Sequence, residues 1–505
     1  MDNAASVLLA FPPDGDLPTL EKYHKAVTAH VQQVERLLKD TTTNLASLAP
    51  LLLEHVNPAV NSISYLALLQ SILASEKTTQ PQRLAVLPSV TAFLMTFDPR
   101  QIRYVGSALS RLLDLVATNE LLPASAAVDV LATAILRLNP AGSMLTSHHL
   151  SLVSLAYETN NIEPALPVLE KTIVFYPGVK GAAAGKRLLG DPALAPAAYL
   201  TPESGLTTKL SSASVLQYDL FCGLCFIQRR MWQQAFDALE RVVTYPTKDL
   251  ACSKIMVDAH NKWVLVGLLL TGKMPALPST TSQAAQKTYA TLGKAYTAIG
   301  KAFEKLTAET IKAEAFSLGQ YSLAEEGNLG LMQLVLSHYQ RWQIVNLGEA
   351  YTKISLEQIR AQTQSAETGA PLETEAEIEA LVESMIGDGM LHGVIEKPAP
   401  AAEEGDDGTP PPPPQPGYLH FLSPADDLSE QQFAAQMLAA AQRIKDLGPV
   451  VKAASERLGT RPEYVRYLVK EQKRDKDGSG PNSAAMGFES TFDEEDLMTG
   501  VTAGI

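Results

Sequence analysis

The chain has 505 residues, 46% of them hydrophobic and 19% charged, which is enough for two or three domains with apolar cores. Its formal net charge of −14 disfavours nucleic acid as a partner, because binding to phosphates requires clustered Lys and Arg. Three Cys are too few for a disulfide framework and indicate a reducing compartment. The longest dense apolar run, Trp263 to Leu270, is too short to span a bilayer, so we expect no membrane segment.

Helical periodicity dominates the chain from Leu20 to Lys353. Apolar residues recur at spacings of three and four, as in the stripe formed by Ile102, Val105, Leu109, Leu112, Leu113 and Val116. We find no convincing run of alternating strands in this region. An all-helical region of this length predicts a stack of helix pairs rather than a single bundle.

Two segments suggest degenerate repeats of the tetratricopeptide type. Ala165 to Pro177 and Ala235 to Pro246 each place Ala early, Leu-Glu in the middle and Tyr-Pro at the end, and each is predicted to be a helix. Their offset corresponds to two units of about 34 residues. Alternatively, they are unrelated amphipathic helices that both end at proline. Gly178 to Ser214, rich in Gly, Ala, Pro, Ser and Thr, is predicted to be a long loop.

The segment Gly267 to Met274, GLLLTGKM, differs by one residue from a phosphate-binding loop. Met274 stands where the loop needs Ser or Thr to bind magnesium. The loop also requires a preceding strand, whereas here an apolar helix runs into Gly272 and Pro275 follows. We interpret the segment as a helix end rather than a nucleotide site.

The spacing of the Cys and His residues argues against a metal site. Cys222 and Cys225 have the spacing of half a zinc site, but Cys252 is the only other cysteine, so we predict buried core cysteines. His148 and His149 are adjacent and diverge by about 100° on a helix, so they cannot share a metal. No nucleophile, base and oxyanion donor can be assembled either, which predicts no enzyme, no metal and no cofactor.

The tract from Ser355 to Ser423 has the element order of a winged helix, with two helices followed by a hairpin. Ser355 to Gln358 and Thr374 to Glu377 are capping boxes, which mark the starts of the two helices. The second helix ends at Gly387, and its apolar face is formed by Ile378, Leu381, Val382, Met385 and Ile386.

The predicted wing consists of two short apolar strands, Leu391 to Ile395 and Tyr418 to Leu422, separated by the acidic, proline-rich insert Pro398 to Pro416. A winged helix commonly binds DNA through its second helix, but here that helix would repel phosphates through Glu373, Glu375, Glu377, Glu379 and Glu383. We therefore interpret this winged helix as a protein-docking module.

A further helix follows the wing and begins at the capping box Ser429 to Gln432. It carries an apolar stripe at heptad spacing, formed by Phe433, Met437, Ala440, Ile444 and Leu447. Such a stripe predicts packing with partner helices. After Gly448 we expect a mostly disordered tail, whose acidic and aromatic end, Phe488 to Met498, is either solvated or a short docking motif.

Together these elements predict a mainly α chain, in which a tetratricopeptide-like (TPR-like) solenoid precedes a winged-helix module, a C-terminal helix and a disordered tail. The predicted divisions are 1–215 for N-terminal helical repeats, 216–350 for helical repeats leading into the winged-helix module, 351–423 for the winged helix with a disordered insert at 398–416, 426–448 for the C-terminal bundle helix, and 449–505 for the acidic tail.

Helical repeats that run into a winged helix resemble the PCI family, which is shared by the proteasome lid, the COP9 signalosome and translation initiation factor three. Within it, the tract Ala235 to Phe303 resembles the family of signalosome third subunits, with a repeat helix ending at proline and an apolar helix ending in Leu-x-Gly-Lys. Gln101 to Tyr104 and Met385 to Gly389 are also similar. The resemblance covers roughly Leu84 to Ile395, with gaps.

The resemblance implies a non-catalytic scaffold of the signalosome, which removes the ubiquitin-like modifier Nedd-eight from cullins through a different, metal-dependent subunit. It implies that the direct partners are other PCI subunits and that metalloprotease-type subunit, and that cullin-RING ligases are indirect partners. It implies neither nucleic acid nor membrane as a partner, and a location in the cytoplasm and the nucleus. PCI subunits pair through wing edges and bundle their C-terminal helices, so the implied interface residues here are Leu391, Val394, Ile395, Tyr418, Phe421, Phe433, Met437, Ile444 and Leu447.

Two other interpretations remain open at this point. The chain can be a PCI scaffold of the proteasome lid or of the initiation factor, since the pattern separates these complexes weakly. It can also be a free-standing helical-repeat adaptor that binds peptides in the groove of its helical stack and does not need the C-terminal helix.

Overall fold

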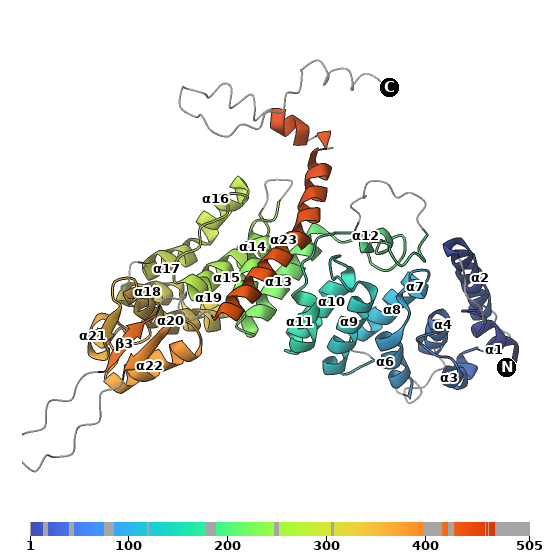
Figure 1. Ribbon diagram of the computed structural model, residues 1–505, viewed down its shortest axis with the longest axis horizontal. Helices are drawn as coiled ribbons and strands as arrows, with labels where there is room; N and C mark the ends of the chain where they lie inside the picture. Colours follow the sequence, from blue (N-terminus) through green and yellow to red (C-terminus); the bar gives the residue numbers. More distant parts are fainter. Residues whose placement is uncertain are drawn as a thin grey trace, which may run out of the picture. The chain divides into compact units, whose positions relative to one another are not determined.

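The computed structural model describes residues 2–13, 19–39, 45–74, 85–118, 121–177, 188–246, 252–304, 308–396, 417–422, 429–459, 461–462 and 464–469. The described chain is mainly helical and contains one three-stranded sheet (Figure 1). It divides into two compact units, Met1–Asp426 and Asp427–Ile505. The insert at 398–416 and the acidic end at 488–498 lie outside the described residues.

The first half of the larger unit is a succession of helices. Their bounds are α1 (Asp2–Leu8), α2 (Leu20–Lys39), α3 (Leu45–His55), α4 (Ser62–Leu73), α6 (Leu87–Thr96), α7 (Pro99–Ile102), α8 (Gly106–Ala117), α9 (Ala124–Leu138), α10 (Ser147–Glu158), η2 (Glu163–Ala165), α11 (Leu166–Leu169) and α12 (Pro196–Tyr199). Neighbours in the chain pack together, as α3 does with α4 and α8 does with α9. This arrangement is that of the expected helical stack.

The second half of the stack leads into the winged helix. Its helices are α13 (Ser212–Gln228), α14 (Trp232–Val243), α15 (Lys254–Thr271), α16 (Gln283–Leu292), α17 (Lys294–Glu304), α18 (Ala308–Leu318), α19 (Gln320–Glu325) and α20 (Leu329–Leu347). Ser211, Ser253 and Ser282 cap α13, α15 and α16, because each side chain accepts a hydrogen bond from the backbone N–H three residues on.

Helix α15 lies at the centre of this half. Its residues Trp263, Val264 and Leu265 are consecutive and all buried, which requires cover on every side. That cover comes from α13, α14, α17 and α20, and Trp263 stacks on Phe236 of α14 with 5.2 Å between ring centroids. The helical core is continuous from Leu8 to Ala366, so the prediction of a mainly α solenoid is confirmed.

The prediction of two equivalent repeat helices is wrong for the first of them. Ala235 to Pro246 does contain a helix, α14, whereas Ala165 to Pro177 is helical only through Leu169 and then extended. The extended part pairs with the chain before α10, where the N–H groups of Val174 and Phe175 donate to the Ser143 carbonyl at 2.8 and 2.9 Å. The β-branched run Thr172, Ile173 and Val174 favours this extended conformation.

The predicted loop from Gly178 to Ser214 is irregular where described, apart from α12 and its last three residues, which begin α13. Hydrogen bonds fix it to the helical stack. The Arg103 guanidinium donates to the carbonyl oxygens of Leu189 and Asp191 at 3.1 and 2.7 Å and lies 3.8 Å from the Tyr199 ring centroid. The Tyr199 hydroxyl in turn donates to the Leu138 carbonyl at 2.6 Å. Arg103 belongs to the tract that resembled the PCI family, and its role here is to fasten this loop to the helical stack.

A second, smaller core defines the winged-helix module. It is formed by β1 (Lys353–Ser355), α21 (Leu356–Gln362), α22 (Glu375–Gly387), β2 (Gly393–Glu396) and β3 (Tyr418–Phe421), together with the end of α20. Both predicted capping boxes are present, at Ser355 and Thr374. The prediction omitted strand β1. The α22 face is buried through Ile378, Val382 and Met385, as its spacing predicted.

Replacing Thr374 with Ala is expected to destabilise α22 by about 1 kcal/mol, the usual contribution of an N-cap hydroxyl. The Thr374 Oγ1 accepts from the Glu377 N–H at 3.3 Å, and alanine leaves that N–H without its acceptor. Urea unfolding measures the loss, and Thr374→Ser serves as the control because it keeps the hydroxyl. Equal stability of the Ala and Ser variants would show that the cap contributes nothing.

The smaller unit contains α23 (Glu430–Gly459), which is longer than the predicted helix at 426–448. The predicted end at Gly448 is wrong, because the helix continues through Gly448 and Pro449. Residues 464–469 are helical as well, so at least these parts of the expected disordered tail are ordered. No helix within the described ranges is long and apolar enough to cross a membrane.

Candidate interaction surfaces

The sheet of the winged helix has the order β1-β3-β2, so β3 lies between the other two strands. The backbone at the end of β3 forms hydrogen bonds on both sides. The Phe421 N–H donates to the Thr352 carbonyl at 3.0 Å, and the Leu422 N–H donates to the His392 carbonyl at 2.9 Å. The resemblance implied an unpaired wing edge along either Leu391 to Ile395 or Tyr418 to Leu422, and only the second alternative is wrong, because β3 is paired on both sides. Within the described sheet, the outer edges belong to β2 and to the three-residue β1.

The predicted wing residues divide between the two faces of this sheet. Leu391 is 5% exposed, and Ile395 and Phe421 pack on the small core, so these three hold the module together. Val394, which is 53% exposed, and Tyr418 lie on the other face, because residues two apart in a strand share a face. Only these last two are placed to meet a partner through their side chains.

A cross-strand charge cluster occupies the same outer face. The Lys353 ammonium lies 2.5 Å from the Glu396 Oε2 and 4.7 Å from the Tyr418 ring centroid, and the His420 Nε2 lies 3.3 Å from the Glu396 Oε1. The hydrogen bond from Lys353 holds the pKa of the Glu396 carboxyl below its usual value. The cluster joins all three strands, and within the described sheet no further strand pairs with the outer edge of β2.

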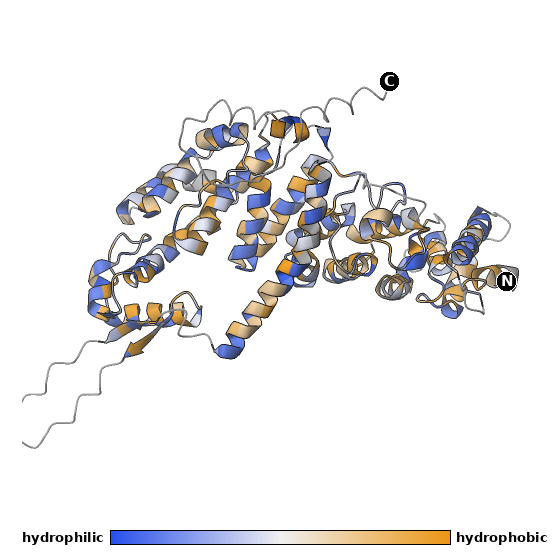
Figure 2. Cartoon of the chain, turned by 45° about the horizontal axis from the view of Figure 1, so that its top comes forward, coloured by the Kyte–Doolittle hydropathy of each residue, from blue (hydrophilic) through white to orange (hydrophobic). Residues whose placement is uncertain are grey.

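Helix α23 presents an exposed apolar stripe. Phe433, Met437, Ile444 and Leu447 are 56%, 59%, 73% and 42% exposed. In Figure 2 apolar residues recur along this helix among polar ones. The stripe continues in the same heptad register beyond the predicted helix end, through Val451, Ala454 and Leu458. Large apolar side chains left in water at heptad spacing are typical of a helix that packs with other helices.

The segment that resembled a phosphate-binding loop is a helix end, as interpreted. Gly272 ends α15 with φ of 67°, a left-handed conformation that glycine adopts without strain. The ring of Trp342 packs so closely on Gly272 that an added Cβ would lie 2.5 Å from it. This close approach leaves no space for a phosphate at the glycine.

Cys222 and Cys225 are buried on one helix, as predicted. Cys222 and Cys225 lie in α13 and are 1% and 0% exposed. Burial raises the pKa of both thiols, that of Cys225 to about 12, so neither is a reactive thiolate. No group of three or more metal-ligating side chains is found among the residues that the structure describes.

His148 and His149 have separate structural roles. The His148 Nε2 lies 3.0 Å from the Ser110 hydroxyl, whereas the His149 Nδ1 accepts from the Thr146 N–H at 3.2 Å and completes the capping box of α10. Burial, with a smaller contribution from His148, lowers the pKa of His149 to about 3. His149 is therefore neutral in the folded protein.

Acidification is expected to destabilise the fold through His149. Its pKa is about 3 in the folded chain and about 6.5 when unfolded, so the unfolded state binds one more proton between these values. The free energy of unfolding therefore falls by about 2 kcal/mol between pH 6.5 and pH 5 on account of this residue. His149→Gln keeps an acceptor for the cap and should remove this part of the pH dependence, measured by urea unfolding at both pH values. An unchanged pH dependence in the variant would contradict the assignment.

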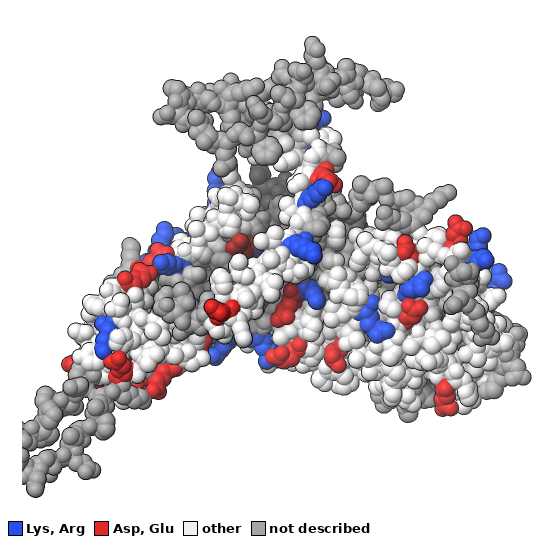
Figure 3. All heavy atoms as spheres, in the orientation of Figure 1, with Lys and Arg blue, Asp and Glu red and all other residues white. Residues whose placement is uncertain are grey.

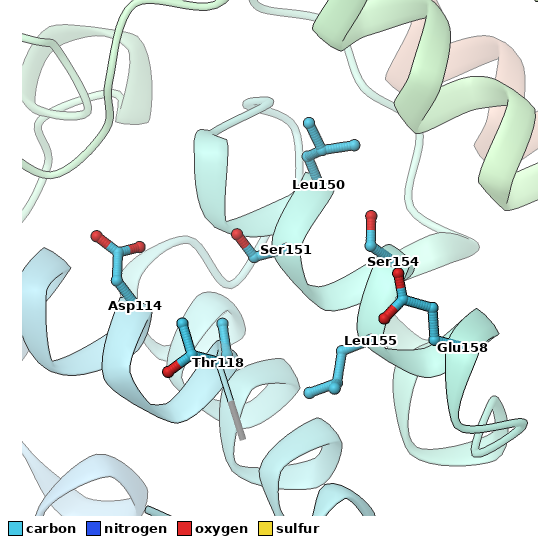
Figure 4. A pocket seen from close by; sticks show the side chains of 8 residues that line it. Asp114, Thr118, Leu150, Ser151, Ser154, Leu155 and Glu158 are labelled. Atoms are coloured by element: carbon cyan, nitrogen blue, oxygen red, sulfur yellow. The ribbon is translucent and has the colours of Figure 1, made fainter. Parts of the chain in front are cut away.

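An open groove between α8 and α10 has a volume of about 360 Å³ (Figure 4). Asp114 and Thr118 line one side, and Ser151, Ser154 and Glu158 line the other. The His148 Nδ1 lies 3.8 Å from Asp114, and its Nε2 lies 3.0 Å from the Ser110 hydroxyl, so this imidazole contacts Ser110 rather than a serine that lines the groove. Sequence analysis missed this groove because its two sides come from separate helices.

A family model for the N-terminal helical repeats of COP9 signalosome complex subunit 3 matches residues 21–189 and 197–285. The chain is 48% identical to COP9 signalosome complex subunit 3 of Neurospora crassa over 512 aligned positions, which cover 100% of both chains. The subunit 3 of Emericella nidulans is 33% identical over 66% of this chain and 68% of its own length. The subunit 3 of Arabidopsis thaliana is 24% identical over 51% and 54%.

Proposed function

Because the chain belongs to the family of COP9 signalosome subunit 3, as its sequence resemblance indicated, we propose that it is a non-catalytic scaffold subunit of that complex. The complex removes Nedd-eight from cullins and thereby regulates cullin-RING ubiquitin ligases, and its catalysis is proposed to lie in a metal-dependent subunit. The observation that carries the proposal is the full-length similarity to the Neurospora protein. Two surfaces of the chain support it.

The first surface is the outer edge of β2 (Gly393–Glu396). An edge strand offers backbone N–H and C=O groups that can pair with a strand of a neighbouring winged helix. Val394 lies on the accessible face beside that edge, whereas Ile395 keeps the strand attached to the core. Pairing through the backbone gives affinity, and the neighbouring side chains, Val394 and Tyr418, contribute specificity.

The second surface is the apolar stripe of α23. A helix of 30 residues is about 45 Å long, so its stripe suits a helical bundle with several partners rather than a single contact. We propose that Phe433, Met437, Ile444 and Leu447 face the bundle, together with Val451 and Leu458. The partners are other PCI-family subunits and the metalloprotease-type subunit, in the cytoplasm and the nucleus, with cullin-RING ligases bound indirectly.

Nucleic acid remains an unsuitable partner for the winged helix. The exposed side of α22 carries Glu375 and Glu383 and no Lys or Arg, which a DNA-binding helix would need. Arg341, from α20, is engaged by Asp388 at 2.9 Å at the far end of α22. The module is thus proposed to bind proteins alone.

A tagged pull-down from the native source, read by mass spectrometry, tests this function. Recovery of PCI proteins with a metalloprotease-type subunit and cullins would support the signalosome role. Deletion of the gene should then raise the fraction of cullin that carries Nedd-eight. Recovery of proteasome or initiation-factor proteins would place the chain in another PCI complex, and recovery of the chain alone as a monomer would favour a free-standing adaptor; either result would overturn the proposal.

A further inference from the structure

The groove between α8 and α10 is negatively charged on both of its sides. Asp114 of α8 and Glu158 of α10 line it, and both residues are exposed. Among the described residues that line the groove, none is Lys or Arg. Figure 3, in contrast, shows acidic and basic side chains interspersed over the visible face of the larger unit. The groove therefore attracts a positively charged group.

The basic residues next to the groove do not neutralise this charge. Arg111 lies one turn before Asp114, but its Nε donates to the Ser107 carbonyl at 3.3 Å, so the guanidinium is directed toward the preceding turn of α8. The His148 Nδ1 lies 3.8 Å from the Asp114 carboxylate, but burial lowers the pKa of His148, so its imidazole is neutral at about pH 7. No ion pair of Glu158 is found among the residues that the structure describes.

The polar side chains of the groove offer mainly hydrogen-bond acceptors. The Thr118 Oγ1 donates to the Leu115 carbonyl at 3.0 Å, and the Ser151 Oγ donates to the Ser147 carbonyl at 3.4 Å. Each of these hydroxyls uses its proton within its own helix and keeps its lone pairs for a ligand, and ionised carboxylates can only accept. Of the described polar side chains that line the groove, only Ser154 has a hydroxyl proton without such a partner. A suitable ligand therefore supplies N–H donors.

The two carboxylates lie at opposite ends of the groove. The Asp114 carboxylate is 3.8 Å from the His148 Nδ1 near the start of α10, and Glu158 is the last residue of that helix. About ten residues of helix separate His148 from Glu158, which corresponds to about 15 Å along the helix axis. One cationic group cannot contact both carboxylates over that length, so a matching ligand carries two.

Apolar side chains lie between these two ends. Ala117, Leu150 and Leu155 complete the lining, and Figure 4 shows Leu155 between Thr118 and Glu158. Such a surface suits an apolar side chain of the ligand and the methylene groups of its basic side chains, whose charged ends meet the carboxylates. Arginine fits this lining better than lysine, because its planar guanidinium has five N–H donors and is more weakly hydrated than an ammonium.

We propose that the groove binds an extended segment of a partner protein with the pattern Arg-x-Leu-x-Arg, in which an apolar residue stands between two arginines. Alternate residues of an extended chain share one face, so all three side chains point into the groove. Residues four apart are separated by about 13 Å, which is close to the spacing of the Asp114 and Glu158 carboxylates. The volume of about 360 Å³ suits a short segment of this kind. The inference does not depend on the scaffold function.

Fluorescence anisotropy of a labelled peptide, titrated with the purified full chain, tests the proposal. The probe is Ser-Arg-Ser-Leu-Ser-Arg-Ser. One control peptide replaces both arginines with citrulline, which keeps the shape and removes the charge, and the other, Ser-Arg-Ser-Leu-Arg-Ser-Ser, moves the second arginine to the opposite face. We expect saturable binding of the probe below about 1 mM and at least about tenfold weaker binding of each control.

Variants of the chain provide matched controls. Asp114→Asn with Glu158→Gln should weaken binding of the probe at least about tenfold, because both charge-assisted hydrogen bonds are lost. Asp129→Asn with Glu170→Gln removes two exposed carboxylates outside the groove and should leave binding unchanged. Ser154→Leu should also abolish binding, since leucine fills the groove while both carboxylates remain. Urea unfolding of each variant checks that the fold is retained.

Several results would overturn the proposal. Equal binding of the citrulline peptide would show that the charges are not recognised, and equal binding of the shifted peptide would show that the groove does not select their spacing. Unchanged binding by Ser154→Leu, or equal loss in the control double variant, would show general attraction to an acidic surface. Absence of saturable binding of the probe below about 1 mM would show that the groove is only solvated.

Discussion

Changing both Phe433 and Ile444 to Asp is expected to weaken binding of the chain to the rest of its complex by about 1000-fold. The two side chains are 56% and 73% exposed on α23, so the isolated chain should fold normally with either residue. In a helical bundle each new carboxylate would be buried without a partner, which costs at least about 2 kcal/mol, and two such costs correspond to about three orders of magnitude in Kd. Titration of the chain onto the complex purified without it measures the change.

The matched control for this double variant lies on the opposite side of the same helix. Ala435 and Gln442 are exposed and fall outside the heptad stripe, and Ala435→Asp with Gln442→Asp adds the same type of side chain, also at two positions. This control should bind nearly as the natural chain does. If both double variants bind normally, α23 does not join a bundle; if both fail, the helix is sensitive to charge in general and the stripe is not its docking face.

The winged helix was predictable because its helices depend on local signals. The hydroxyls of Ser355 and Thr374 each accept a hydrogen bond from a backbone N–H in the first turn of their own helix. The capping sequence is sufficient to predict such hydrogen bonds. Strand β1 is different, because its three residues are too few to show alternation and it forms only by pairing Ile354 with Leu419, far along the chain. Because β1 was not predicted, Tyr418 to Leu422 remained a possible sheet edge beside Leu391 to Ile395, although β1 pairs with it.

Two helix ends predicted from proline residues were wrong. Gly448 and Pro449 predicted a helix end, yet α23 continues through both residues. The heptad spacing of apolar residues continues at Val451, and this pattern indicates the longer helix. Pro177 predicted a helix that ends there, yet the chain is already extended. Its partner, the Ser143 carbonyl, lies before α10, and nothing in the local sequence indicates that pairing.

The contacts that hold the start of α20 against α15 and α17 could not be predicted for a similar reason. The Lys262 ammonium of α15 donates to the Glu326 carbonyl at 3.1 Å and pairs with Asp258, and the Tyr296 hydroxyl of α17 donates to the Glu326 Oε2 at 2.5 Å. The Asn328 side chain donates to the Tyr296 hydroxyl at 2.8 Å. Two of the acceptors, the Glu326 backbone carbonyl and the Tyr296 hydroxyl, lie far along the chain from their donors, and sequence patterns do not reveal such pairs.

This network fixes the start of α20, and α20 belongs to both cores of the larger unit. Met332 and Val335 lie in the large helical core, whereas Ile344 lies in the core of the winged helix. The position of the winged helix on the stack therefore depends on how firmly the start of α20 is held by Lys262 and Glu326. We therefore expect the loss of Lys262, a charged residue that is 5% exposed, to be costly.

Replacing Lys262 with Met is expected to lower the free energy of unfolding by about 3 kcal/mol. The Lys262 side chain is 7% exposed, and its removal leaves the Asp258 carboxylate and the Glu326 carbonyl without their buried donor. Urea unfolding measures the total loss, and hydrogen exchange should show the largest change at the start of α20. Lys254→Met, at the exposed first residue of the same helix, should change stability by less than about 0.5 kcal/mol. Adding Asp258→Leu to Lys262→Met should recover part of the loss, because it removes the unpaired charge; a further decrease would show that Asp258 is stabilised by water rather than by Lys262.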